Sequence, residues 1–129
     1  MKILFWNCQG IANSDTLSVL KRMIITHYPI LFSIAEPKVS FSPKFHHLCQ
    51  YGYTFTGATK TSSVIDTQWI FSHSSIHNVN IFSILDQFFT CDFVFERTRI
   101  TYSFVYSKNR YQDRRPLWED LNYINNSTQ

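Results

Sequence analysis

The stretch of residues 2–38 decides the fold; it begins with KILFWNCQG at residues 2–10 and ends with PILFSIAEPK at residues 29–38. Each of these apolar runs ends on a polar residue, Asn7 in the first and Glu36 in the second. An amphipathic segment lies between them, so the pattern predicts a strand–helix–strand unit. Neighbouring parallel strands end at the same edge of a sheet, where α/β proteins bind their ligands. We therefore expect Asn7 and Glu36 to lie close together.

The segment between the two runs has the signals of an amphipathic helix. Ser14 or Asp15 can cap its start, because either side chain can accept a hydrogen bond from a free backbone N–H group. Apolar residues then recur at helical spacing, namely Leu17, Leu20 and Ile24. Tyr28-Pro29 ends the helix, since the residue before a proline is disfavoured in the α conformation. Ile30–Ala35 is short and apolar, which predicts a buried strand.

The remainder of the chain is predicted to be mostly β-structure. A short helix is expected at Phe45–Gln50 and a loop at Gly57–Asp66. Aromatic or β-branched runs predict strands at Tyr51–Thr56, Gln68–Ser72, Val79–Leu85, Phe88–Phe95 and Arg99–Tyr106. Glu96-Arg97-Thr98 fits a hairpin turn between the last two strands, and Asp113 can cap a closing helix. Antiparallel strands after one parallel unit predict a mixed sheet, in an α/β or α+β fold class.

The composition indicates one domain with its own core, since the chain has 129 residues, of which 44% are apolar and 17% aromatic. The net charge of +3 is compatible with a nucleic-acid partner, and equally with an ordinary, slightly basic surface. Cys8, Cys49 and Cys91 form no CxxC pair, so we expect free thiols rather than zinc ligands. No apolar run approaches the roughly 20 residues of a membrane-spanning helix. We expect an intracellular protein, in the nucleus or cytoplasm, without a membrane partner.

Three motifs resemble one protein superfamily. They are Trp6-Asn7-Cys8-Gln9-Gly10, then Glu36-Pro37-Lys38, and later Phe104-Val105-Tyr106-Ser107 with Arg114-Arg115-Pro116-Leu117-Trp118-Glu119-Asp120-Leu121. In order and spacing they resemble the exonuclease–endonuclease–phosphatase superfamily, which has the DNase-I-like fold. The likeness is greatest to the amino-terminal part of the endonuclease domain of plant LINE-type retrotransposons. It implies a partial four-layer α/β/β/α sandwich, about one sheet with flanking helices, in a single truncated domain over residues 1–129.

The resemblance also implies roles for particular residues. Glu36 would be a magnesium ligand, and hard divalent cations do prefer carboxylate oxygens. Asn7 would hydrogen-bond the scissile phosphate or a metal-bound water, and Tyr106 would donate to charge developing on the phosphate. The backbone of a DNA partner would be contacted by Arg110, Arg114 and Arg115. Without the resemblance, each residue also has an ordinary structural interpretation. Glu36 would be a glutamate at a strand end, Asn7 an asparagine that terminates a strand, and Tyr106 a core aromatic, and the arginines would lie at a solvated helix start.

The later motifs of the superfamily are absent from the sequence. After Tyr106 there is no histidine, and the aspartates Asp113 and Asp120 fall in the predicted closing helix. The Gly-Asp-Phe-Asn strand end and the Asp-His pair, which the resemblance requires for acid–base chemistry, are both missing. We therefore expect weak or absent magnesium binding and a domain that is inactive alone. The alternative is a non-catalytic module that binds nucleic acid or protein.

A single sheet covered by helices on one face would leave its other face without a partner. Apolar side chains on such a face would drive self-association or the docking of the missing second half of the domain. The side chains expected on or near the uncovered face are Phe82, Phe89, Phe93, Phe95 and Phe104.

Overall fold

The computed structural model describes residues 1–60, 66–84 and 88–106. Their strands form two sheets. The first sheet has the order β1 (Ile3–Asn7), β2 (Leu31–Ala35), β4 (Asp66–His73) and β3 (Tyr53–Lys60). The second sheet has the order β5 (His77–Ile84), β6 (Phe88–Phe95) and β7 (Thr98–Val105). The described helices are α1 (Ser14–His27) and the 3₁₀ helix η1 (Pro43–Cys49).

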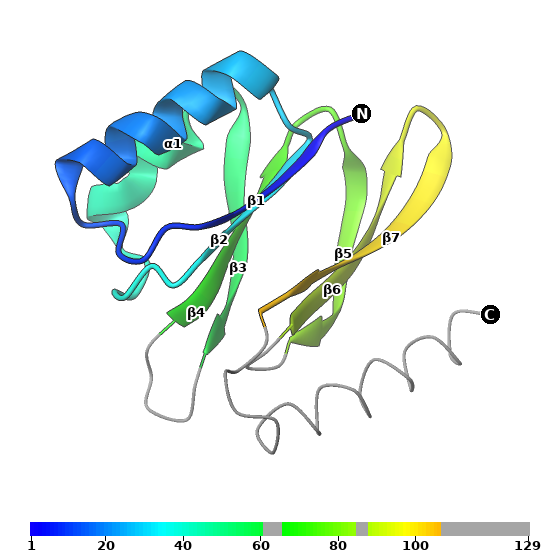
Figure 1. The fold of residues 1–129 in the computed structure, drawn as a ribbon. Coiled ribbons are helices and arrows are strands. Elements are labelled where there is room, and N and C mark those ends of the chain that lie inside the picture. The colour runs from blue at the N-terminus through cyan, green and yellow to red at the C-terminus, as the bar shows by residue number, and fades with distance from the viewer. Residues whose placement is uncertain (61–65, 85–87, 107–129) are drawn as a thin grey trace.

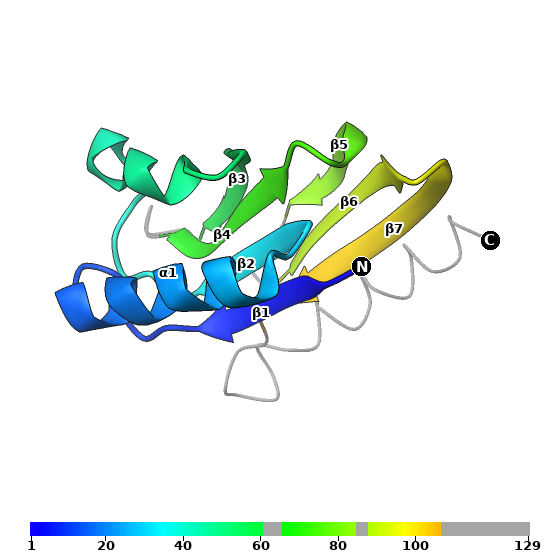
Figure 2. The same cartoon turned by 90° about the horizontal axis from the view of Figure 1, so that it is seen from above.

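The two sheets lie face to face, and the helices cover the outer face of the first sheet (Figures 1 and 2). One apolar cluster fills the space between the helices and the first sheet, and includes Leu20, Ile24, Phe45, Trp69 and Phe71. A second cluster fills the space between the sheets, and includes Leu31, Ile70, Phe89, Phe93 and Phe104. Because successive residues of a strand face opposite sides, β4 contributes Trp69 and Phe71 to the first cluster and Ile70 to the second.

This arrangement confirms the mixed α/β fold class but corrects the expectation of about one sheet. The inner face of the first sheet is not left open, because the second sheet packs on it. Phe89, Phe93 and Phe104 are each at most 1% exposed, so the prediction that they form an uncovered surface was wrong. Phe95 is partly buried against the same cluster, and the side chain of Phe82 lies outside the described part. The alternation of apolar residues indicates which side chains share a face of a strand, but not whether another element packs on that face.

The predicted strand–helix–strand unit is confirmed. β1 pairs in parallel with β2, which places Asn7 opposite Ala35, and every residue of β2 is buried. The N-cap is Asn13 rather than Ser14 or Asp15, because the Asn13 side chain accepts a hydrogen bond from the backbone N–H of Asp15. The helix ends at Tyr28 as expected, in a left-handed conformation.

Two of the predicted connections have different outcomes. Glu96 and Arg97 have positive φ angles of 47° and 66°, so the hairpin turn between β6 and β7 is confirmed. Of the loop expected at Gly57–Asp66, residues 57–60 belong to β3 and Asp66 begins β4, while residues 61–65 lie outside the described residues. A Cβ atom at Gly57 would lie 3.2 Å from the Phe89 ring, so this glycine lets the second sheet approach β3 closely. The closing helix expected from Asp113 onward lies outside the described residues.

Candidate functional site

Asn7 and Glu36 lie at the same edge of the first sheet, as the sequence predicts. Asn7 is the last residue of β1 and Glu36 follows the neighbouring parallel strand β2, and backbone hydrogen bonds join the segments beyond the strand ends. The N–H groups of Cys8, Gly10 and Ile11 donate to the carbonyls of Ala35, Glu36 and Pro37 at 3.0, 2.8 and 3.0 Å. These bonds hold the two segments in a fixed mutual position.

The backbone at this edge adopts uncommon conformations. Gln9, Glu36 and Lys38 have positive φ angles of 52°, 54° and 61°, although none of them is a glycine. Such conformations cost on the order of 1–3 kcal/mol each and persist only where the surroundings impose them. The hydrogen bonds between the two segments supply that constraint, and the turn at Glu36 takes its side chain out of the sheet. Strain of this kind is concentrated at functional sites in many proteins.

Tyr106 reaches the same edge from the second sheet. Its phenol O–H donates a hydrogen bond to Oε1 of Glu36, a residue 70 positions away in the sequence. Nearby, the rings of Phe5 on β1 and Phe104 on β7 stack with their centroids 6.0 Å apart. Asn7 is exposed and lies two residues after Phe5, so it belongs to the strand face that is directed toward β7. The structure therefore joins Tyr106 to Glu36 and places Asn7 at the same sheet edge, and the chemical roles of all three stay predictions.

The surroundings keep the hydroxyl of Tyr106 protonated. Partial burial, together with the hydrogen bond to Glu36 and the charge of that carboxylate, raises the pKa of Tyr106 to about 12. A neutral phenol can donate a proton to an anionic oxygen, whereas a phenolate cannot. Burial also raises the pKa of the Cys8 thiol, which donates weakly to the carbonyls of Ala35 and Glu36 at 3.4 and 3.5 Å. Burial and a raised pKa are typical of a thiol that packs in the core.

Sequence analysis missed the polar residues at the start of β4. β4 is antiparallel to β2, so its first residues lie at the edge where β2 ends, and Gln68 stands opposite Ala35. Asp66 is only 3% exposed and accepts hydrogen bonds from the backbone N–H of Phe41 and from Nε1 of Trp69 at 2.9 and 2.8 Å. The signal was present, because Asp66-Thr67-Gln68 directly precedes the apolar run of β4.

The described residues offer few ligands for a metal ion. Within residues 1–60, 66–84 and 88–106, no three histidine, cysteine or acidic side chains are grouped closely enough to hold one. At the site edge, the oxygen donors are the carboxylate of Glu36 and the amide of Asn7. Magnesium uses one or two carboxylates together with waters and substrate phosphates, so these residues suit it only as a partial set. The predicted DNA contacts Arg110, Arg114 and Arg115 lie outside the described residues.

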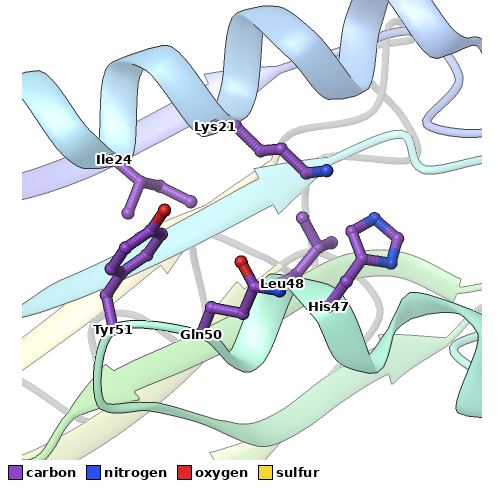
Figure 3. A pocket seen from close by; sticks show the side chains of 6 residues that line it. All are labelled: Lys21, Ile24, His47, Leu48, Gln50 and Tyr51. Atoms are coloured by element: carbon purple, nitrogen blue, oxygen red, sulfur yellow. The ribbon is translucent and has the colours of Figure 1, made fainter.

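Two hollows among the described residues lie away from this edge. One lies between α1 and η1 and has a volume of about 10 Å³, room for about one water molecule (Figure 3). It is lined by Lys21, Ile24, His47, Leu48, Gln50 and Tyr51. A larger, open hollow of about 380 Å³ is lined by residues 1–4, His27 and Pro29, at the other end of β1 from Asn7.

In the described part of the chain, no helix is both long and apolar enough to cross a membrane.

The fold is shared with solved structures of nucleic-acid-processing proteins. One is TDP2 of D. rerio complexed with single strand DNA product, at a TM-score of 0.65 and 11% sequence identity; the match covers 95% of this chain and 52% of TDP2. This chain has part of a DNase-I-like fold. The 3'-5' exonuclease NExo of Neisseria meningitidis is also similar, at a TM-score of 0.56 and 16% identity, over 84% of this chain and 42% of the exonuclease.

These matches are a likeness of fold, at low sequence identity. The chain spans about half the length of the two solved proteins. No protein-family model and no curated protein matches the sequence. The part of the DNase-I-like fold that is present includes the edge where Asn7, Glu36 and Tyr106 meet.

Proposed function

We propose that this chain is a truncated retrotransposon-type endonuclease domain, related to magnesium-dependent phosphodiester hydrolases and inactive alone. The observation that carries the proposal is the hydrogen bond from Tyr106 to Glu36. It brings together two motifs that lie far apart in the sequence, at the edge where Asn7 also lies. The similar folds of TDP2 and the exonuclease support a DNA partner.

Each residue has a separate task in this proposal. Glu36 holds magnesium, and a bound magnesium ion would neutralise charge on a phosphate oxygen. Asn7 orients the phosphate, because its amide can both donate and accept hydrogen bonds without titrating. With a phosphate bound, the Tyr106 hydroxyl would exchange its hydrogen bond to Glu36 for one to the phosphate, where charge develops. Arg110, Arg114 and Arg115 contact the DNA backbone.

The missing acid–base residues explain why we expect inactivity. Hydrolysis needs a group that activates water and a group that protonates the leaving oxygen. The sequence has no histidine after Tyr106, and the Asp66 carboxylate beside Glu36 at this edge is engaged by Phe41 and Trp69. Catalytic groups that act as a unit lose nearly all of their effect when several are absent.

Magnesium should bind only weakly to the isolated chain. Because one carboxylate is in place, we expect a dissociation constant on the order of 1 mM or weaker. Calorimetry on the wild type should therefore show no saturable site at low concentration. Glu36→Gln should remove the remaining heat, whereas Glu96→Gln, a control in the exposed hairpin turn, should leave it unchanged. Tight binding that is lost in Glu36→Gln would show that a further ligand exists.

The isolated chain should not cleave DNA measurably. A supercoiled plasmid incubated with the protein and magnesium should remain supercoiled, because the acid–base pair is missing. Glu36→Gln and Tyr106→Phe should give the same result as the wild type. Nicking by the wild type that disappears in both variants would overturn the proposed inactivity and support the proposed site.

An adjoining genomic reading frame with a Gly-Asp-Phe-Asn motif and a reverse-transcriptase region would support the retrotransposon origin.

The alternative function is a non-catalytic binding module. The surface available for binding is smaller than the open sheet face expected from the sequence. The inner face of the first sheet is packed. Among the described residues, β1 and β7 are edge strands of their sheets, and they carry the exposed side chains of Phe5 (40% exposed) and Val105 (38% exposed). Strands at sheet edges can pair with another polypeptide. We therefore keep self-association or docking of a second half-domain as proposals for this edge. We also propose an intracellular location, in the nucleus or cytoplasm, and the three free cysteines are compatible with it.

A further inference from the structure

Gln68 forms a buried polar link between the two sheets. Its side chain is fully buried on β4, within the layer where the sheets pack together. Its Oε1 accepts a hydrogen bond from Oγ of Ser33 on β2 at 3.1 Å. Its Nε2 donates to the backbone carbonyl of Phe104 on β7 at 3.4 Å. The first sheet is thus joined to β7 two residues before Tyr106.

The neighbouring residue of β4 holds the other partner of the site. The carbonyl of Thr67 accepts a hydrogen bond from the N–H of Glu36 at 2.9 Å. Two successive residues of β4 therefore hold the two partners of the Glu36–Tyr106 contact. Thr67 bonds to the backbone of Glu36, and Gln68 bonds to β7, the strand that leads into Tyr106. The contact between Glu36 and Tyr106 spans two sheets, so its geometry depends on how those sheets are joined at this end.

We propose that Gln68 is a positioning residue, which anchors the end of β7 to the first sheet and thereby places the Tyr106 hydroxyl on Glu36. The proposal gives a role to a residue outside the three superfamily motifs. Its importance for catalysis rests on the proposed function, but the positioning itself can be measured on a protein without activity.

The chemistry of a buried amide supports this role. A buried amide costs free energy unless both its donor and its acceptor have partners, and at Gln68 both do. Leucine is similar in size but cannot bond to Ser33 or to the Phe104 carbonyl. Gln68→Leu should therefore keep the packing between the sheets and release the end of β7. Tyr106 would then lose its fixed approach to Glu36.

A double-mutant cycle in urea tests the proposal. In the wild type, Tyr106→Phe removes one hydrogen bond and should lower the folding equilibrium constant by about fivefold. In the Gln68→Leu background, the same change should lower it by less than about twofold, because the bond is already weakened. Proton NMR should also lose the contact between the Tyr106 ring and the Glu36 side chain in Gln68→Leu. A residue that only stabilised the fold would leave the effect of Tyr106→Phe unchanged.

Thr90→Val supplies the matched control. Thr90 is buried, and its hydroxyl bonds to the Ser103 hydroxyl at 2.7 Å between β6 and β7 of the second sheet. Tyr106→Phe should keep its full effect in the Thr90→Val background. If Gln68→Leu does not fold, Ser33→Ala replaces it and should reduce the effect of Tyr106→Phe partly.

Two outcomes would overturn the proposal. One is an undiminished effect of Tyr106→Phe in both the Gln68→Leu and Ser33→Ala backgrounds, and the other is no effect of Tyr106→Phe in the wild type. Neither outcome depends on magnesium or on cleavage of DNA. Failure of this proposal is therefore distinguishable from failure of the proposed function.

Discussion

Replacement of Phe104 by alanine should lower the free energy of unfolding by about 3–5 kcal/mol. Phe104 is 1% exposed between the sheets and lies against the rings of Phe5 and Tyr102, with centroid distances of 6.0 and 5.0 Å. Its removal leaves a cavity that these side chains can fill only in part. A single domain has roughly 5–15 kcal/mol of stability in total, so this one change should remove a large share of it.

Phe5→Ala is the matched control, because Phe5 stacks on the same ring but is 40% exposed. It should cost clearly less than Phe104→Ala, since truncating a side chain that is already hydrated creates no closed cavity. Urea unfolding followed by tryptophan fluorescence measures both variants. If the two substitutions cost the same small amount, the second sheet is not packed on the first in solution. The chain would then expose the apolar face that the sequence led us to expect.

The second large effect is a loss of stability in alkaline solution. Burial raises the pKa of Tyr53 to about 12, and the Tyr53 hydroxyl donates to the carbonyl of Pro29 at 2.7 Å. Burial also raises the pKa of Cys91 to about 12. The ordinary values of these groups are 10.0 and 9.0, so the unfolded chain releases their protons at lower pH than the folded chain. Their contribution to stability is full below pH 9 and is lost as the pH rises toward 12.

Tyr53→Phe isolates one of these contributions. Below pH 10, the variant should be less stable than the wild type, because it lacks the hydrogen bond to Pro29. As the pH rises above 10, the variant should lose this disadvantage and then become the more stable of the two, since only the wild type must keep that phenol protonated. Urea midpoints measured from pH 8 to 11.5 test this, with Tyr51→Phe, which alters a tyrosine that is 52% exposed, as the control. A constant difference across this range would contradict the burial of Tyr53.

The candidate site was predictable where it depends on neighbours in the sequence. Asn7 and Glu36 end two apolar runs that are joined by one helix. A helical crossover of this kind is the usual connection between neighbouring parallel strands. Tyr106 was named from its motif, but its bond to Glu36 joins residues 70 positions apart. No local periodicity specifies a pairing across that distance. Gln68 was missed because a polar residue at the start of a strand is ordinarily exposed, and here the second sheet covers it.

The amino-acid sequence by itself determined the local elements of this protein: the helix that ends at Tyr28, the buried strand β2 and the hairpin turn at Glu96-Arg97. These follow from side-chain spacing and backbone preferences within a few residues. Only the tertiary structure decided that the strands divide into two sheets and that Phe89, Phe93 and Phe104 close the core between them. Alternation along a strand indicates which side chains are on the face that will be buried. Which surface covers them is settled by packing among segments far apart in the chain, and the meeting of Glu36, Gln68 and the end of β7 depends on that packing.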